Sequence, residues 1–194
     1  MKICKVISNN KIYLRTKYLS ERRSMEKKEI NSLSYSVTNK LQKMKIWDKT
    51  YYHIYNSILE NNELNTYFLI NFLSAKQKQI IIPKIQNNRL LHFKIDDSTD
   101  FKLNNYGINE PINGTQINIE KIDIIFIPLI IFDLSGHRVG YGKGYYDRFL
   151  KSLNSNTVKI GLSLFEPVEE IIDINNYDVS MDICVTPNSI YDFK

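Results

Sequence analysis

The sequence predicts an α/β protein: one domain over residues 1–194, with three α/β/α layers around a mainly parallel, Rossmann-like open sheet. Two observations carry this prediction. Segments with strand character alternate with segments of helical periodicity almost throughout, which is typical of a parallel sheet covered on both faces. Residues 122–132, IDIIFIPLIIF, form a continuous apolar and β-branched run, typical of a strand buried on both faces. The composition, 43% hydrophobic and 24% charged, suits a folded domain of this length.

The first part of the chain predicts helices before strands. Residues 10–23 predict a helix, because an asparagine can cap its start and apolar residues recur on one face. Residues 32–44 predict a second helix from apolar residues three to four positions apart. Residues 50–57, TYYHIYNS, predict a tyrosine-rich strand. Helical spacing returns over residues 65–76.

The rest of the chain continues the alternation. Two strands separated by a polar turn are predicted at residues 79–83 and 89–95. Residues 96–118 are polar and contain two glycines and a proline, so we expect a long, partly irregular connection. The elements expected after the buried strand and a glycine-rich loop are a helix over 145–153, a strand over 158–165, an amphipathic segment near 167–172 and a last strand over 183–186.

Charge and composition limit the classes of function. A net charge of +5 and a pI near 9.0 suit an anionic ligand: a nucleotide, a polyglutamylated cofactor or nucleic acid. The abundance of Lys, Asn, Ile and Tyr is equally typical of an AT-rich genome, so charge alone does not decide among these ligands. The longest apolar run is too short to span a bilayer and no signal-like segment begins the chain, so we expect a cytoplasmic protein without a membrane partner.

Cysteine and histidine spacing argues against a structural metal or disulfide. Cys4 and Cys184 form no CxxC pair, and the three histidines, His53, His92 and His137, have no metal-ligand spacing. We therefore expect neither zinc nor a structural disulfide.

The most informative segment is residues 136–150, GHRVGYGKGYYDRFL, which holds four of the seven glycines. Glycine accepts positive φ and lets a ligand approach the backbone, so such a loop can direct several N–H groups at one anion. The alternative is that the glycines only shape a turn. The interleaved Arg138, Lys143 and Asp147 favour a polyphosphate site.

Spacing excludes the two common phosphate motifs. Five residues separate Gly136 from Gly142, where the Walker pattern GxxxxGK[ST] needs four, and Lys143 is followed by Gly144. The dinucleotide pattern GxGxxG, started at Gly140, would need glycine where Tyr145 stands.

The segment RVGYGKGYYDRFL instead resembles the signature of the 5-formyltetrahydrofolate cyclo-ligase family. Further elements resemble that family in the same order, over nearly the whole chain. They are KxxLR (Lys11, Leu14, Arg15), ExxT (Glu63, Thr66), IIIPK at 80–84, GIxEP (Gly107, Ile108, Glu110, Pro111) and a closing segment (Gly161, Leu162, Asp178, Asp182, Thr186).

The resemblance implies an ATP-dependent ligase of one-carbon metabolism. Proteins of this family convert 5-formyltetrahydrofolate to 5,10-methenyltetrahydrofolate with MgATP and release ADP and phosphate. ATP phosphorylates the formyl oxygen, and N10 then closes the ring. Such a transfer asks the protein chiefly for positioning and charge neutralisation.

The resemblance also implies roles for individual residues. Lys143 and Arg138 would be catalytic, with Lys143 nearest the transferred phosphoryl group. The implied ATP-binding residues are Lys11, Arg15, Arg138, Val139, Gly140, Tyr141, Gly142, Lys143, Gly144, Tyr145 and Tyr146. Lys11 and Arg15 lie four positions apart, so both can point at one anion, although a solvated basic face is the alternative.

For Mg²⁺, the implied ligands are Asp147 and, second, Asp182, because a hard cation takes one or two carboxylates together with phosphate oxygens and water. Asp133 is better explained as a cap or turn residue. Disulfides and other metals are not implied.

The implied folate-binding residues are Glu63, Asn65, Tyr141, Gly142, Lys143, Gly144 and Tyr145. The folate is expected with or without a polyglutamate tail. Asn65 departs from the family pattern, which is usually acidic there; an amide can bind a pterin but brings no charge. Glu63 has a structural role as its alternative. Tyr141, Tyr145 and Tyr106 could lie against a flat ring.

Two other functions compete. A basic, tyrosine-rich module could bind single-stranded nucleic acid through cations and stacking. That function needs alternating basic and aromatic residues, which occur only at 141–148, so we expect no nucleic-acid partner. The other competitor is a different ATP-dependent folate or carboxylate ligase with another acceptor pocket.

Overall fold

The structure is a computed structural model and describes residues 9–194. Cys4 lies outside the described residues, and Cys184 is a buried free thiol. Within the described part, no helix is both long and apolar enough to cross a membrane.

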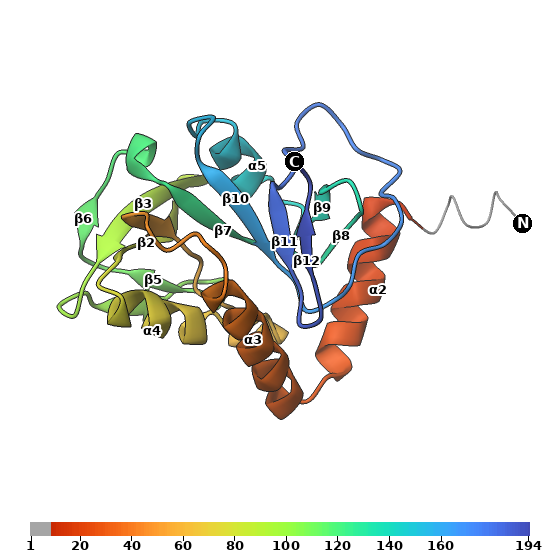
Figure 1. Ribbon diagram of the computed structural model, residues 1–194, viewed down its shortest axis with the longest axis horizontal. Helices are drawn as coiled ribbons and strands as arrows, with labels where there is room; N and C mark the ends of the chain where they lie inside the picture. Colours follow the sequence, from red (N-terminus) through yellow and green to blue (C-terminus); the bar gives the residue numbers. More distant parts are fainter. Residues whose placement is uncertain (1–8) are drawn as a thin grey trace, which may run out of the picture.

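Two helices open the described part of the chain, and strands interrupted by two further helices follow (Figure 1). The helices are α2 (Lys11–Ser24), α3 (Lys27–Gln42), α4 (Tyr67–Ala75) and α5 (Tyr145–Leu150), with 3-10 turns η1 (Leu59–Asn61) and η2 (Ile119–Lys121). The strands are β1 (Tyr51–His53), β2 (Gln79–Gln86), β3 (Arg89–Ile95), β4 (Phe101–Leu103), β5 (Asn109–Pro111), β6 (Thr115–Gln116), β7 (Ile124–Pro128), β8 (Ile131–Phe132), β9 (Arg138–Val139), β10 (Val158–Leu162), β11 (Ile183–Val185) and β12 (Ile190–Asp192).

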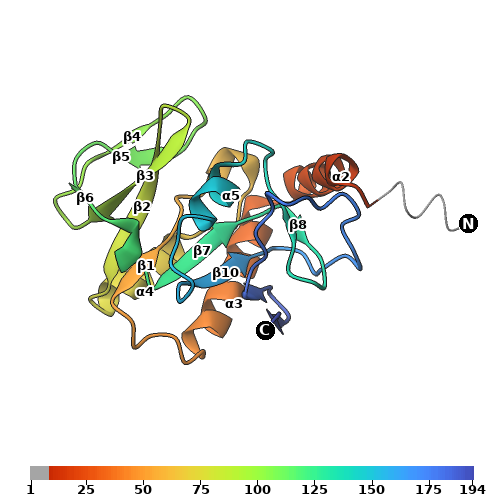
Figure 2. The ribbon, with the colours of Figure 1, turned by 90° about the horizontal axis from the view of Figure 1, so that it is seen from above.

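One eight-stranded sheet runs through the molecule in the order β12-β11-β10-β7-β1-β2-β3-β6 (Figures 1 and 2). Its five central strands, β11 to β2 in this order, are parallel, and the edge strands are antiparallel. In the register, Tyr52 of β1 lies between Ile80 of β2 and Ile124 of β7. The prediction of a mainly parallel open sheet is therefore confirmed.

Alternate residues of the central strands pack on opposite faces, which creates the three layers. Ile80, Ile82 and Phe126 share a buried cluster with α3 and α4. Their neighbours Ile81 and Ile125 pack with Phe149 and Leu150 of α5 on the other face. Because every second residue of a strand points the same way, strands that are apolar throughout need cover on both sides. Figure 1 shows α3 and α4 on one side of the sheet and α5 on the other.

The prediction of one continuous strand over residues 122–132 is wrong. β7 ends at Pro128, which has no N–H to continue the ladder, and β8 then leaves the sheet to form a separate hairpin with β9. Gly136 lies in the turn of this hairpin with φ +81°, and a Cβ there would be 2.8 Å from the Phe193 ring. The first glycine of the motif therefore shapes a turn, and the anion-binding candidate shortens to residues 140–144.

Several boundaries also differ from the predictions. α5 ends at Leu150 instead of residue 153, α3 begins at Lys27 instead of 32, and the strand expected over 50–57 is only β1. Residues 167–172, expected only as an amphipathic segment, form an irregular stretch in which Val168 bridges to Asp133 and the Ile171 amide donates to the same carboxylate. Asp133 also accepts from the amides of Ser135 and His137, which confirms it as a turn residue.

A buried histidine pair lies beneath α5. His53 Nε2 is 3.1 Å from His92 Nδ1, and Phe149 stacks on His92. Burial lowers the pKa of both rings, to about 4 for His92, and the neighbouring His92 lowers that of His53 further. Because both imidazoles are neutral in the folded protein, the unfolded chain binds protons first as the pH falls.

We therefore expect the free energy of unfolding to decrease between about pH 6.5, the ordinary histidine pKa, and about pH 4. Each proton bound only by the unfolded chain contributes about 1.4 kcal/mol per pH unit. Urea denaturation from pH 7.5 to 4 measures this slope. The double variant His53→Leu with His92→Leu should lose most of the slope contributed by the pair, and an unchanged slope would contradict the assignment.

Candidate active site

A cavity of about 820 Å³ opens beside the carboxyl ends of the parallel strands. Pro128 ends β7 and Tyr55 follows β1, and both line it. Open α/β sheets bind ligands at this edge, and the volume is within the usual range for small-molecule sites. The glycine loop 140–144 forms another wall, so the loop and the sheet edge enclose one site.

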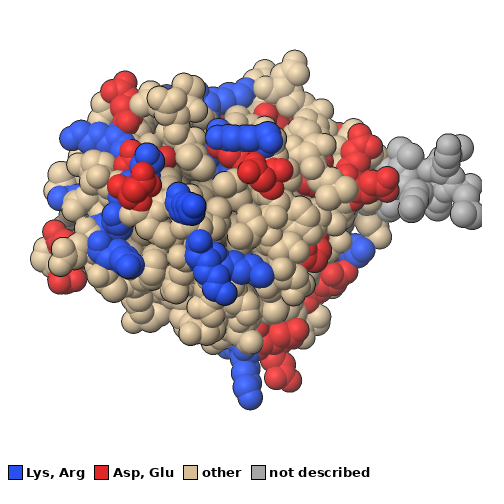
Figure 3. All heavy atoms as spheres, in the orientation of Figure 1, with Lys and Arg blue, Asp and Glu red and all other residues tan. Residues whose placement is uncertain are grey.

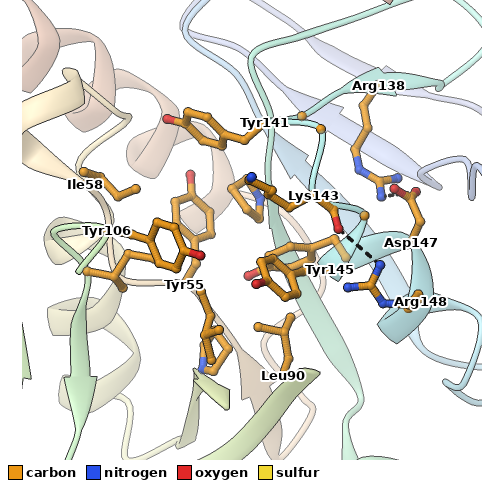
Figure 4. A pocket seen from close by; sticks show the side chains of 18 of the residues that line it. Tyr55, Ile58, Leu90, Tyr106, Arg138, Tyr141, Lys143, Tyr145, Asp147 and Arg148 are labelled. Atoms are coloured by element: carbon orange, nitrogen blue, oxygen red, sulfur yellow. Dashed lines mark hydrogen bonds and ion pairs between the residues drawn. The ribbon is translucent and has the colours of Figure 1, made fainter. Parts of the chain in front are cut away.

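The cavity has two chemically different ends (Figure 4). Apolar and aromatic side chains, including Tyr55, Ile58, Leu90 and Tyr106, gather at one end. The other end holds charged groups. The cations that line the cavity are Lys11, Arg15, Arg138, Lys143, Arg148 and Lys151, and the acids are Glu63, Glu110, Asp147 and Asp178. Such a cavity can hold a flat, partly apolar molecule together with an anion.

The glycine loop is held against helix α2 by Arg15. Its Nε donates to the Gly140 carbonyl over 2.7 Å. Gly142 has φ +85°, and a Cβ there would be 3.4 Å from the Arg15 guanidinium carbon. Glycine at 142 is therefore favoured by its backbone conformation, whereas a Cβ there would make only an ordinary van der Waals contact with Arg15.

Lys143 projects into the middle of the cavity (Figure 4). Its ammonium group makes no ion pair or hydrogen bond with any residue from 9 to 194, and only its backbone carbonyl is engaged, by Arg148. A cation that has no counter-ion among these residues and projects into a cavity is available to an anionic ligand. Tyr141 and Tyr145 flank it, as the motif predicts.

Arg138 lines the cavity but is already neutralised. One terminal nitrogen donates to Asp147 Oδ1 over 2.6 Å, and the other donates to the Val179 carbonyl. Burial lowers the pKa of the guanidinium, and the charge of Asp147 opposes this shift. Arg138 therefore orients Asp147 as much as it supplies positive charge.

Lys11 and Arg15 both line the cavity, so the two side chains share one face of α2. The side chain of Lys11 is only 14% exposed and forms an ion pair of 2.5 Å with Asp178. The alternative of a solvated basic face is wrong for this pair.

The positions of the carboxylates show that one of the two expected Mg²⁺ ligands, Asp182, lies outside the cavity. Asp147 keeps Oδ2 without a partner among residues 9–194, and Asp178 lies at the same end, paired with Lys11. Asp182 does not line the cavity: it accepts from the Lys159 amide and pairs with the ammonium groups of Lys159 and Lys194. Asp147 with Asp178, instead of Asp182, is the acidic pair that fits a hard cation bound beside phosphates. No cluster of three or more potential ligands occurs in the described residues.

Of the two residues expected from the ExxT segment to bind folate, Glu63 borders the cavity and Asn65 does not. Glu63 is 5% exposed and borders the cavity; burial raises its pKa, and hydrogen bonds from Tyr141 and the Ile58 amide oppose this. Asn65 does not line the cavity, because its side chain bonds Asn31 and caps the Tyr67 amide at the start of α4. The expected contact of Asn65 with a ligand is thus wrong.

The expectation that Val139 lies in the ATP-binding site is also wrong. It is 1% exposed and packs in β9 against Leu14 and Ile131, away from the cavity. The other glycine-loop residues expected to bind, 140–146, all line the cavity together with Arg138.

A scan against protein-family models matches residues 7–187 to the 5-formyltetrahydrofolate cyclo-ligase family. The chain belongs to this family. Cyclo-ligases are enzymes, and the resemblance predicted from the glycine loop is confirmed over nearly the whole chain.

Similar proteins carry the same family name. The chain is 41% identical over 73 residues to 5-formyltetrahydrofolate cyclo-ligase of Mycoplasma genitalium, which covers 37% of this chain and 44% of that relative, less than two thirds of its length. It is 32% identical over 132 residues to that of Haemophilus influenzae, covering 64% and 71%. The solved Aquifex aeolicus 5,10-methenyltetrahydrofolate synthetase has a TM-score of 0.81 at 29% identity, covering 95% of this chain and 93% of that one.

Sequence reasoning missed some residues of this cyclo-ligase cavity. Glu110 was part of a motif without an assigned role, yet it is buried in the cavity wall, where it accepts from the Ile85 amide. Arg22, 3% exposed, contacts two wall residues from behind. Its spacing was a usable signal, because positions 11, 15 and 22 fall on one helical face.

Proposed function

We propose that this cyclo-ligase uses MgATP to convert 5-formyltetrahydrofolate, with or without a polyglutamate tail, to 5,10-methenyltetrahydrofolate, with release of ADP and phosphate. The observation that carries the proposal is one cavity in which the ammonium group of Lys143, unpaired within residues 9–194, lies between an aromatic end and a cationic end. A pterin suits the first end and a polyphosphate suits the second.

The reaction has two steps whose atoms balance. The formyl oxygen attacks the γ-phosphorus of ATP, and the bond to the bridging oxygen breaks to release ADP. N10 then attacks the activated formyl carbon, its proton is lost, and the carbon–oxygen bond breaks to release phosphate. A formamide needs this activation, because its carbon is a poor electrophile and its oxygen a poor leaving group.

Each end of the cavity has a task in this reaction. Lys143 faces the transferred phosphoryl group and stabilises its developing charge, while Lys11, Arg15 and the loop amides bind the remaining phosphates. Asp147 and Asp178 would hold Mg²⁺, which neutralises phosphate charge. Tyr141 and Tyr145 lie against the flat ring, and the carboxylate of Glu63 accepts hydrogen bonds from pterin N–H groups.

The nucleic-acid alternative has little support. The cations discussed above line one cavity together with four acids instead of a continuous surface track. Figure 3 shows acidic and basic side chains interspersed on the visible face. The expectation of a cytoplasmic location stays a prediction.

The assay is direct. Purified protein with MgATP and 5-formyltetrahydrofolate should form the methenyl chromophore and release one ADP per product. Omitting ATP should abolish both signals. Folded protein that forms no chromophore with ATP would contradict the proposal, and ADP release with another acceptor alone would favour a different ligase.

A further inference from the structure

Arg22 is a buried cation behind the wall of the cavity. It lies near the end of α2, is 3% exposed and does not line the cavity itself. No ion pair within 4.0 Å neutralises it among residues 9–194. A buried charge is costly unless it is hydrogen-bonded, so its partners indicate what it does.

Arg22 first fixes the segment that carries Glu63. Its Nε donates to the Asn61 carbonyl over 3.0 Å. The side-chain Nδ2 of Asn62 donates in turn to the backbone carbonyls of Arg22 and Met25, over 3.0 and 2.9 Å. Asn62 has φ +50°, a conformation that asparagine tolerates. Three hydrogen bonds therefore attach residues 61–62 to the end of α2 and place Glu63 beside Arg22.

Arg22 also contacts the glycine loop. Its Nη2 donates to the phenol oxygen of Tyr141, and the guanidinium carbon lies 5.6 Å from the centre of that ring. The same phenol donates its proton to Glu63 Oε1, and the Ile58 amide donates to Oε2 over 2.6 Å. The phenol thus links a buried cation to a buried carboxylate through two hydrogen bonds.

The protonation states of the two linked groups follow from their burial and from the neighbouring charges. Burial raises the pKa of Glu63, whereas the Tyr141 hydrogen bond, the Ile58 amide and the charge of Arg22 lower it. Burial raises the pKa of Tyr141 first, so the proton stays on the phenol. The other titratable groups facing Glu63 are the phenols of Tyr55 and Tyr146, both with pKa raised by burial. Arg22 is the cation that favours the ionised carboxylate.

We propose that Arg22 is a positioning residue for the folate end of the cavity: acting through Tyr141, it orients the Glu63 carboxylate and couples the glycine loop to α2. The inference rests on the proposed function in one respect, that the ligand at this end is the folate. Without Arg22, the phenol loses its donor and the carboxylate protonates more easily. Each wall then keeps only its other link to the helix: the Arg15 bond to Gly140, and the Asn62 side-chain bonds to the backbone carbonyls at 22 and 25.

The test compares Arg22→Met with Arg22→Lys and with a matched control, Arg23→Met. Arg23 is the next residue of α2 and is exposed, so its change keeps the helix and removes an equal charge. Calorimetry measures 5-formyltetrahydrofolate binding without ATP, and ATP binding separately, from pH 5 to 8.5. We expect Arg22→Met to weaken folate binding on the order of 10–100-fold and ATP binding much less, because Arg15 still holds the glycine loop against α2. Lys should restore part of the affinity and Arg23→Met should match wild type.

The pH profile distinguishes this role from a general packing role. If the ionised Glu63 binds folate, folate affinity is lost as the pH falls through the pKa of Glu63. Removing Arg22 raises this pKa, so the acid limb of the affinity–pH profile should move to higher pH in Arg22→Met. Tyr141→Phe should move it in the same direction. Because Arg22 acts through the phenol, the losses in Arg22→Met and Tyr141→Phe should be clearly less than additive in the double variant.

Two outcomes overturn the inference. One is an Arg22→Met protein that binds folate with wild-type affinity and an unmoved acid limb; the other is strictly additive losses. If Arg22→Met fails to fold, Arg22→Lys and Tyr141→Phe carry the same comparison. Amide hydrogen exchange without ligand tests the coupling separately: exchange over residues 140–146 should rise in Arg22→Met and Arg22→Lys but not in Arg23→Met. Wild-type protein that binds no folate would instead overturn the proposed function.

Discussion

Replacing Lys143 with alanine should lower the turnover number by about 10²–10³-fold, the cost of removing one preorganised group that stabilises charge in the transition state. The ammonium group projects into the cavity and has no counter-ion among the described residues, so its charge is available to the transferred phosphoryl group. Steady-state assay of chromophore formation measures the effect. The KM for folate should change much less than the turnover number, because the gain arises mainly in the transition state.

Stability provides the internal control for Lys143→Ala. The side chain is exposed and makes no hydrogen bond or ion pair within residues 9–194, so the urea midpoint should stay at the wild-type value. Lys121→Ala removes the same side chain from an exposed position outside the cavity and should change neither activity nor stability. Lys143→Arg keeps the charge and should recover part of the rate. Unchanged turnover in Lys143→Ala would mean that another cation faces the phosphoryl group.

Replacing Asp147 with asparagine should raise the Mg²⁺ concentration that supports half-maximal activity by about tenfold or more. Asparagine keeps the size of the side chain but removes the negative charge that suits a hard cation. The same change leaves the buried Arg138 without its counter-ion, so the free energy of unfolding should also fall by about 1–3 kcal/mol. Activity measured against free Mg²⁺ at saturating ATP gives the first effect, and urea denaturation gives the second.

Asp182→Asn is the matched control for the metal effect. Asp182 also pairs with cations, Lys159 and Lys194, but it lies outside the cavity. This variant should lose stability while its Mg²⁺ requirement stays at the wild-type value. If Asp182→Asn changes the requirement and Asp147→Asn does not, the assignment of the metal to the Asp147 end is wrong.

The fold and the place of the site could be predicted because they depend on local patterns. Alternating strands and helices dictate a parallel sheet with two covered faces, and such a sheet binds ligands at one edge. The spacing of Lys11 and Arg15 places them on one face of a helix whatever the tertiary structure. The division of the apolar run at Pro128 was harder to predict from the sequence, because β7 and β8 consist of the same kinds of apolar residue.

The wrong assignments involve neighbours in the sequence that face different ways. Asp178 and Asp182 both belong to the closing segment, but β11 begins just after Asp182, and that carboxylate turns to the β10 amide of Lys159. Glu63 and Asn65 are two residues apart, yet Glu63 follows the left-handed Asn62 and Asn65 caps α4. Motif position identifies such residues as a group, whereas the backbone conformation decides which of them reaches the ligand.

Helix α2 acts as a rigid spacer between the two ends of the cavity. Eleven positions separate Lys11 from Arg22, about 16 Å along a helix that carries a cation at each end and Arg15 between them. Displacing this helix as a body would therefore weaken nucleotide and folate binding together, whereas changing Arg22 alone should weaken folate binding far more than nucleotide binding. A loss that affects both substrates in equal proportion is thus the signature of helix movement, and a loss confined to one substrate identifies a single contact.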